Sequence, residues 1–318
     1  MTELYDVVVK NRQIQGENVV VLELESAQKG ICLPRVEAGA HVDLHLPNGL
    51  IRQYSLCQNP QQEGIFRLGI LNDPDSRGGS RSAYDEIQTG MQLKVSQPKN
   101  LFPLHKARHS ILVGGGIGIT PLIAMAYALH QENASFELHY CAKSEHSSAF
   151  VDELKHGPLA SYTTFHFKDQ GANHREFFEQ FMQHLLEDTH IYTCGPNGFM
   201  DWVINLAKAH KLPDQQIHKE YFQVEADLSG DAFDVVAKRS GKTIRVHAEE
   251  TILSALAREG ICIEMSCEQG VCGTCMCDVL EGEPDHRDVY FTDEEKADNE
   301  QILVCCSRAK SARLVLDI

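Results

Sequence analysis

Four cysteines in the last sixth of the chain constrain its structure more than any other feature. Cys267, Cys272 and Cys275 are separated by four and two residues, and Cys305 follows after twenty-nine more. This spacing is typical of a [2Fe–2S] cluster, in which two irons need four thiolates close together. Glycines inside the loop allow it to turn tightly, because glycine adopts positive φ angles without a steric penalty.

A four-cysteine zinc site is the alternative interpretation of these residues. Zinc sites usually contain two Cys-x-x-Cys pairs, whereas this set contains one, formed by Cys272 and Cys275. We therefore favour the cluster. Three further cysteines, Cys262, Cys277 and Cys306, lie close in sequence to the predicted ligands.

The composition limits the class of protein. A length of 318 residues suggests about two domains. No apolar run approaches the roughly 18 residues that a membrane span needs, and the polar N-terminus does not resemble a signal peptide. Eleven cysteines without an export signal favour metal binding or reactive thiols in a reducing cytoplasm. The net charge of −16 argues against binding to nucleic acid, whose phosphates would be repelled.

The N-terminal region, residues 4–100, contains short β-rich stretches separated by turn signals. Such stretches suggest a small antiparallel β-barrel. An Arg-Gln-Tyr-Ser motif occupies residues 52–55, and a Gly-Gly-Ser turn at 78–80 precedes a predicted helix at 83–87. Consecutive glycines before a helix let backbone N–H groups approach a phosphate.

The next region changes character at about residue 103. A predicted apolar strand at 109–113 runs into the glycine-rich loop 114–121, and a predicted helix follows at 122–130. This order of strand, glycine loop and helix is typical of pyrophosphate binding. Strands and helices then alternate, which predicts a parallel sheet with crossover helices. A Cys-Gly-Pro segment at 194–196 ends one of these strands, at the same sheet edge as the glycine loop.

The C-terminal region follows a polar link at 224–230. A predicted hairpin pairs residues 233–237 with 242–246, and a predicted helix at 251–259 precedes the cysteine loop. The acidic run 281–300 contains nine acidic and two basic residues. Such a run is usually a solvated face, but it can also steer a basic partner, and both interpretations remain open.

Together these motifs resemble the phthalate dioxygenase reductase family, which serves Rieske oxygenases, and the resemblance covers nearly the whole chain. It implies three domains: a flavin-binding antiparallel β-barrel at 1–103, an α/β parallel-sheet NAD-binding domain at 104–226, and an α+β plant-type ferredoxin domain at 232–318. The cofactors that it implies are FMN, NADH and a [2Fe–2S] cluster.

The resemblance also assigns roles to residues. Catalytic roles fall to Ser55, near the flavin ring, to Cys194, beside the nicotinamide, and to Phe222, covering the flavin. Cluster ligands are Cys267, Cys272, Cys275 and Cys305, with Cys306 excluded by the family pattern. The implied cofactor-binding residues are Arg52, Gln53, Tyr54, Ser55, Gly78, Gly79, Ser80, Gly114, Gly115, Gly116, Gly118, Thr120, Cys194, Gly195, Pro196 and Phe222.

The implied function is electron transfer from NADH through FMN and the cluster to a separate Rieske-type oxygenase. NADH is preferred over NADPH, although Lys143 could favour a 2′-phosphate. Within the family, the C-terminal segment is most similar to carnitine monooxygenase and vanillate demethylase reductases, and we favour the carnitine type. Two alternatives stay open: a reductase for another acceptor, such as a haem monooxygenase, and a zinc-stapled NAD-binding module without redox function.

Overall fold

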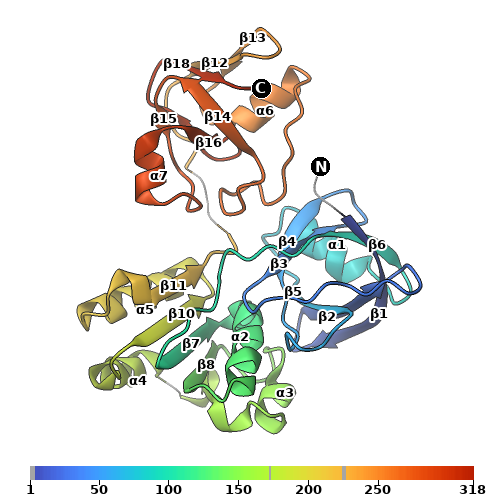
Figure 1. The fold of residues 1–318 in the computed structure, drawn as a ribbon, viewed down its shortest axis with the longest axis vertical. Coiled ribbons are helices and arrows are strands. Elements are labelled where there is room, and N and C mark those ends of the chain that lie inside the picture. Colours follow the sequence, from blue (N-terminus) through green and yellow to red (C-terminus); the bar gives the residue numbers. More distant parts are fainter. Residues whose placement is uncertain (1–3, 172, 224–226) are drawn as a thin grey trace. The chain divides into compact units, whose positions relative to one another are not determined.

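A computed structural model describes residues 4–171, 173–223 and 227–318 of the chain (Figure 1). The chain divides into two compact units, Met1–Glu220 and Tyr221–Ile318. Two large sheets lie in the first unit and one in the second. Residues 224–226 of the predicted polar link lie outside the described residues. The domain boundaries predicted at 103, 226 and 232 stay predictions.

The first sheet is antiparallel, with the strand order β4-β3-β6-β1-β2-β5. Its core consists of apolar side chains that point inward from alternating strand positions, among them Leu22 and Leu24. The helix α1 (Gly79–Asp85) contacts β5. The strand bounds are β1 (Leu4–Gln15), β2 (Val19–Ser26), β3 (His41–His45), β4 (Ile51–Ser55), β5 (Ile65–Leu71) and β6 (Gln92–Ser96).

The closure of this sheet is incomplete. Its outer strands are β4 and β5, and Leu56, directly after β4, forms an isolated antiparallel bridge with Leu68 of β5. The antiparallel sheet agrees with the prediction, but no continuous ladder closes it into a barrel among the residues that the structure describes. The predicted helix at 83–87 is wrong in its start, since α1 begins at Gly79.

The second sheet is parallel, with the strand order β11-β10-β7-β8-β9. Every residue of β7 is buried, as expected for a central parallel strand covered on both faces. The strand bounds are β7 (His109–Gly115), β8 (Phe136–Ala142), β9 (Thr163–Phe167), β10 (Thr189–Cys194) and β11 (Ile217–Glu220). The helix bounds are α2 (Ile119–Gln131), α3 (Val151–His156), α4 (His174–Phe181) and α5 (Asn197–Ala209).

The second unit contains a mixed sheet with the order β13-β12-β18-β14-β16. β12 and β18 pair in parallel and the other neighbours are antiparallel. The Thr251 side chain caps α6 by accepting from the Ser254 N–H, and Thr292 with Glu295 forms a capping box on α7. The bounds are β12 (Phe233–Ala237), β13 (Lys242–Val246), β14 (Met276–Glu281), β15 (Pro284–Asp285), β16 (Gln301–Leu303), β17 (Arg308–Ala309), β18 (Arg313–Leu316), α6 (Ile252–Arg258) and α7 (Asp293–Asp298).

The three architectures agree with the predicted fold class: an antiparallel sheet, a parallel α/β sheet and an α+β unit. The predicted hairpin at 233–237 and 242–246 is confirmed by the pairing of β12 with β13. None of the helices that the structure describes combines the length and apolar character needed to cross a lipid bilayer.

Candidate functional site

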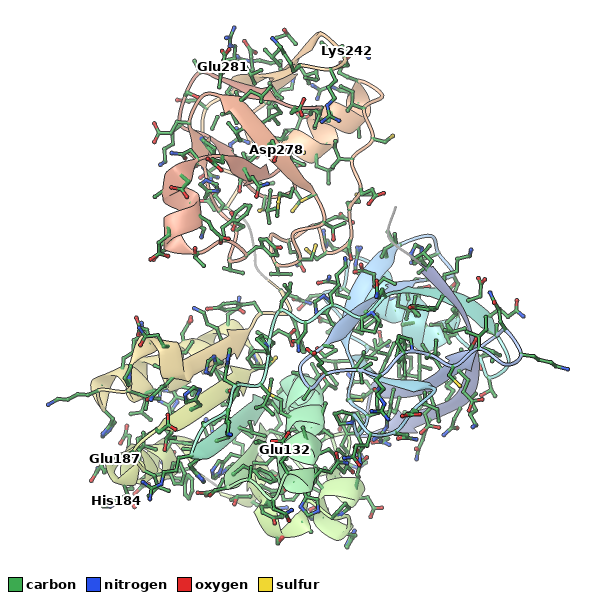
Figure 2. The ribbon with its side chains drawn as sticks, in the orientation of Figure 1. Glu132, His184, Glu187, Lys242, Asp278 and Glu281 are labelled. Carbon is green, nitrogen blue, oxygen red and sulfur yellow. The ribbon has the colours of Figure 1, made fainter. Side chains whose placement is uncertain are left out.

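The four predicted cluster ligands are buried and interact in pairs. Cys267, Cys272 and Cys275 lie on the loop between α6 and β14, and Cys305 lies just after β16. The thiols of Cys267 and Cys272 interact with each other, as do those of Cys275 and Cys305, and Cys305 also interacts with the thiol of Cys306. Sulfur atoms gather near β14 in this unit (Figure 2). The arrangement brings together residues up to 38 positions apart, from 267 to 305.

One thiol in each pair is shifted toward the thiolate. The hydrogen bond with Cys267 lowers the pKa of Cys272 to about 6. Hydrogen bonds with Cys275 and with Cys306 lower the pKa of Cys305 to about 4. The backbone N–H of Gln269 lies 3.3 Å from the Cys267 Sγ atom, and the N–H of Thr274 lies 3.4 Å from that of Cys272. Because thiolates are the metal-binding form of cysteine, these donors favour iron ligation.

Two glycines let the loop approach its surroundings closely. Gly270 has a φ of 71°, and a Cβ atom built on it would lie 2.6 Å from the Cys306 Sγ atom. Gly273 has a φ of 75°, and its Cβ would lie 2.4 Å from the ring of Tyr290. A side chain at either position would therefore be strained by its φ angle and by contact.

The extra cysteines occupy different environments. Cys306 is fully buried behind the loop, whereas Cys262 is exposed and Cys277 lies inside β14. Among the described residues, no three Cys, His, Asp or Glu side chains are placed to hold one metal ion between them. Two pairs of thiols are compatible with two irons, since each iron of a [2Fe–2S] cluster takes two protein thiolates.

Asp288, which lies in the acidic run 281–300, supports the cysteine loop. The buried carboxylate of Asp288 accepts from the backbone N–H groups of Tyr290, at 3.1 Å, and Phe291, at 2.9 Å. The Ser307 hydroxyl donates to Asp288 at 3.4 Å, and the Val289 N–H donates to the Gly270 carbonyl at 3.1 Å. Asp288 thus connects the turn after Cys305 with the cysteine loop.

In the first unit, the structure brings together the two predicted flavin motifs. Arg52 lies on β4, and its side chain packs so closely on Gly79 that a Cβ there would be 2.7 Å from the Arg52 Cγ atom. Gly78 is the N-cap of α1 with a φ of 96°. The N–H groups of Gly78 and Ser80 point to the Ser76 hydroxyl, at 3.2 and 3.3 Å. Gly79 and Ser80 form the first turn of α1 and not a loop before it.

The other residues of the Arg-Gln-Tyr-Ser motif line β4. Gln53 Nε2 lies 3.1 Å from the His41 ring, and burial raises the pKa of the Tyr54 hydroxyl. The hydroxyl of Ser55 donates to the Glu220 carboxyl group at 3.1 Å. Glu220, at the end of β11, was not among the predicted site residues.

The Glu220 carboxyl group is electrostatically unusual. Burial raises its pKa to about 8, against the opposing effect of the Ser55 hydrogen bond. Its negative charge and, more strongly, burial raise the pKa of the Cys194 thiol. Ser55, Cys194 and Glu220 therefore form one group at the carboxyl ends of β10 and β11, where ligands bind in parallel sheets.

The two predicted nucleotide segments also come together. Gly114 of β7 pairs with Cys194 of β10, and a Cβ on Gly118 would lie 2.3 Å from the Cys194 carbonyl oxygen. A Cβ on Gly195 would lie 2.9 Å from the Cα atom of Gly115. The glycines therefore let two backbone segments touch at one sheet edge.

The remaining residues of these segments differ in their surroundings. A Cβ on Gly115 would also meet Pro196 at 3.2 Å, whereas one on Gly116 would project into open space, at a φ of 56°. Thr120 is buried, and its hydroxyl donates to the Ile117 carbonyl at 3.0 Å. Phe222 belongs to the second unit and is partly buried, so its predicted contact with the flavin stays a prediction.

Comparison with known proteins assigns the cysteine loop and the glycine-rich loop to two different domain families. The family model described as the 2Fe-2S iron-sulfur cluster binding domain matches residues 235–310. The model described as the oxidoreductase NAD-binding domain matches residues 112–204. The first range contains the four paired cysteines, and the second contains the glycine loop and Cys194.

Relatives of full length extend the match to the whole chain. The chain is 44% identical over 319 aligned positions to a vanillate O-demethylase oxidoreductase from a Pseudomonas species, covering 99% of this chain and 100% of that protein. It is 38% identical to the carnitine monooxygenase reductase subunit of Escherichia coli, covering 92% of each chain.

A solved structure shares the fold of the whole chain. Phthalate dioxygenase reductase, described as a modular structure for electron transfer from pyridine nucleotides to [2Fe–2S], has a TM-score of 0.77 and 36% identity. The match covers 99% of this chain and 98% of that chain. The protein therefore belongs to the phthalate dioxygenase reductase-like family of oxygenase reductases, oxidoreductases that transfer electrons from NAD(H) through a flavin to a [2Fe–2S] cluster.

Proposed function

We propose that this chain is the reductase component of a two-component Rieske oxygenase and delivers electrons from NADH, through FMN and a [2Fe–2S] cluster, to a separate oxygenase chain. The observation that carries the proposal is the end-to-end similarity to a vanillate O-demethylase oxidoreductase. The grouping of each predicted set of site residues supports it.

For the cluster, we propose Cys267, Cys272, Cys275 and Cys305 as ligands. Their pairing supports this assignment, because each iron of a [2Fe–2S] cluster takes two protein thiolates. Amide hydrogen bonds to sulfur also fit, since such bonds stabilise the reduced cluster and tune its potential. Cys306 then acts as a neighbour of the ligands.

For FMN, we propose that Arg52 binds the phosphate through its guanidinium, together with the turn at 78–80. The close packing of Arg52 on Gly79 fits this role, because it leaves the guanidinium beside the start of α1. Gln53, Tyr54 and Ser55 then face the ring system. When bound, FMN supplies the ability to accept two electrons at once and to release them singly.

For NADH, we propose that the glycine-rich loop, represented by Gly114, Gly116, Gly118 and Thr120, holds the pyrophosphate and that the segment 194–196 borders the nicotinamide. The contact between these two segments supports the assignment. Ser55 and Cys194 meet at Glu220, which we propose holds a proton at its carboxyl group near neutral pH. Phe222 remains our candidate for covering the flavin ring.

For the acceptor, the relatives favour an oxygenase that demethylates a methoxylated aromatic acid such as vanillate. Identity to the vanillate O-demethylase oxidoreductase is higher than to the carnitine reductase subunit and extends over the entire length. This ranking reverses the preference for carnitine that we drew from the C-terminal segment. Carnitine monooxygenase is the second candidate, supported by its own relative.

The decisive experiment reconstitutes the purified protein with each oxygenase. The isolated protein should show flavin and cluster absorption, and NADH should bleach both under anaerobic conditions. In a separate, aerobic assay that supplies O2 to the oxygenase, added vanillate demethylase oxygenase should consume vanillate in proportion to NADH. Carnitine oxygenase should support a lower rate. The Cys305→Ser variant is the control, because its flavin should still be reduced while oxygenase turnover stops. Absence of either absorption band, or no turnover with any Rieske oxygenase, would contradict the proposal.

A further inference from the structure

A partly buried ion pair links the two sheets of the first unit, outside every cofactor motif named above. Arg67 of β5 donates from its guanidinium to the carboxylate of Glu153, in α3, at 2.6 Å. Their side chains are only 16% and 22% exposed. The other oxygen of Glu153 accepts the hydroxyl of Tyr127, in α2, at 2.8 Å. One carboxylate thus connects β5 to two helices of the nucleotide-binding sheet.

Neighbouring groups hold both the backbone and the side chain of Arg67 in place. The backbone of Arg67 is fixed because its N–H donates to Gln58 at 3.1 Å and its carbonyl accepts the Cys57 N–H at 2.9 Å. The Arg67 guanidinium also lies over the ring of Phe150, 5.0 Å from its centroid. Charge pairs with so many partners define one geometry and tolerate little displacement.

Phe150 has an unusual backbone conformation at this contact. It is buried, precedes α3 as its N-cap, and has a φ of 63°, which is rare for a bulky residue. Its N–H donates to the Gln15 side chain of β1 at 2.8 Å. Such strain persists only where the surroundings impose it, and it is concentrated at functional positions.

The Phe150 side chain also packs where elements of the predicted flavin and NADH sites meet. A Cβ built on Gly69 of β5 would lie 2.7 Å from the Phe150 ring and 2.9 Å from the Thr120 methyl group. β5 contacts α1, which begins in the predicted flavin turn at 78–80, and Thr120 lies in the glycine-rich loop 114–121. The side chains of Phe150 and Thr120 therefore press against the strand where the flavin-binding and nucleotide-binding elements meet.

We propose that Arg67, Glu153 and Phe150 are positioning residues that hold the flavin and nicotinamide sites at the separation required for hydride transfer. The inference rests on the proposed function. Hydride transfer needs reacting atoms about 3–3.5 Å apart, and a displacement of about 1 Å can cost about 100-fold in rate. Because no β-ladder joins the two sheets among the described residues, side-chain contacts such as that of Arg67 with Glu153 hold them together.

The test compares Glu153→Gln with the double variant Arg67→Met, Glu153→Leu. The double variant removes both charges, so that neither remains buried without a partner. Glu25→Gln is the matched control, since Glu25 pairs with Lys10 on the exposed face of β1 and β2. Flavin reduction is followed by anaerobic stopped-flow at increasing NADH and, separately, with dithionite, and rates are expressed per bound flavin.

In Glu153→Gln and in the double variant, we expect the limiting rate of flavin reduction by NADH to fall at least tenfold. The NADH dissociation constant should stay within threefold of wild type. Reduction by dithionite should be unchanged, because it needs no nucleotide alignment. Amide hydrogen exchange in residues 147–154, measured without NADH, should accelerate. The control variant should match wild type in all four measurements.

Two outcomes would overturn the inference. One is a limiting rate within twofold of wild type in the double variant. The other is a loss that appears only as weaker NADH binding, which would make these residues part of nucleotide affinity and not of alignment. If wild-type protein itself were not reduced by NADH, the proposed function would fail. If NADH reduces the flavin of wild type and of these two variants equally fast, only this inference fails.

Discussion

Replacing Glu220 with glutamine should remove a pH-dependent loss of stability from the first unit. The carboxyl group of Glu220 has its pKa raised by burial from 4.5 to about 8. In the folded protein it therefore keeps its proton up to about pH 8, whereas in the unfolded chain it loses the proton above about pH 4.5. Between these values the folded state binds more protons, so the free energy of unfolding falls as pH rises.

The size of this effect follows from the shift. Each pH unit contributes up to about 1.4 kcal/mol, and a shift of about 3.5 units gives about 5 kcal/mol in total. Because the Glu220 residue is only partly buried, solvent screens part of this effect, and we expect a total loss of stability of about 3 to 5 kcal/mol. Glutamine has the same shape and no titration. The free energy of unfolding of the variant should thus match that of wild type near pH 5 and exceed it near pH 8.5.

The single tryptophan of the chain makes the measurement specific to this unit. Trp202 lies in α5 and packs against Phe178, so its fluorescence reports on unfolding of the unit that contains Glu220. Urea unfolding is followed between pH 5 and pH 8.5 for wild type, Glu220→Gln and the exposed control Glu25→Gln.

The difference between the two stability curves isolates Glu220 from other titrating groups. Buried histidines such as His139 and His166 have pKa values lowered to about 4 by burial, so their contribution to stability increases as pH rises toward 6.5. That contribution is common to all three proteins and cancels. Parallel curves for wild type and Glu220→Gln, within about 0.5 kcal/mol over the whole range, would refute the reasoning.

Other predictions address the proposed sites. Cys305→Ser should lose most of the cluster iron and Cys306→Ser should retain it, as measured by iron content; equal iron in both would overturn the ligand assignment. Arg52→Ala should weaken FMN binding about tenfold or more without loss of iron, because it removes a charge-assisted bond, and unchanged FMN affinity in a titration would exclude that role. Gly270→Ala should lower cluster occupancy, because its Cβ would meet the Cys306 sulfur at 2.6 Å; full occupancy would show that the loop can adjust. The triple variant Asp293→Ser, Glu294→Ser, Glu295→Ser should reduce the salt dependence of partner reduction but not that of flavin reduction; identical salt slopes in variant and wild type would make the acidic run a solvated face.

Several features of the fold and sites could be predicted from local sequence. The cluster loop was recognisable because three of its ligands must come from one short segment, which leaves a fixed spacing in the chain. The glycine-rich loop was recognisable for a similar reason, since strand, loop and helix follow one another directly. The hairpin of β12 and β13 was predicted to the residue because its alternating burial and its turn are both local.

Some local predictions were incomplete. The start of α1 was placed four residues late because Gly79 and Ser80 have weak helix propensity, and only the left-handed Gly78 N-cap shows where the helix begins. The extent of barrel closure depends on how far β4 and β5 pair, which involves side chains on strands distant in sequence.

By itself, the sequence determined that an NAD-binding module is followed by a [2Fe–2S] module, and it predicted which residues carry their chemistry, because ligand spacing and loop composition are properties of short segments. Only the tertiary structure decided which distant residues act together. The Ser55 hydroxyl meets Glu220 across 165 positions, and Arg67 meets Glu153 across 86. Neither pairing has a local signal, because each depends on how two sheets pack. Packing also removes water from the Glu220 carboxyl group, and this burial raises its pKa.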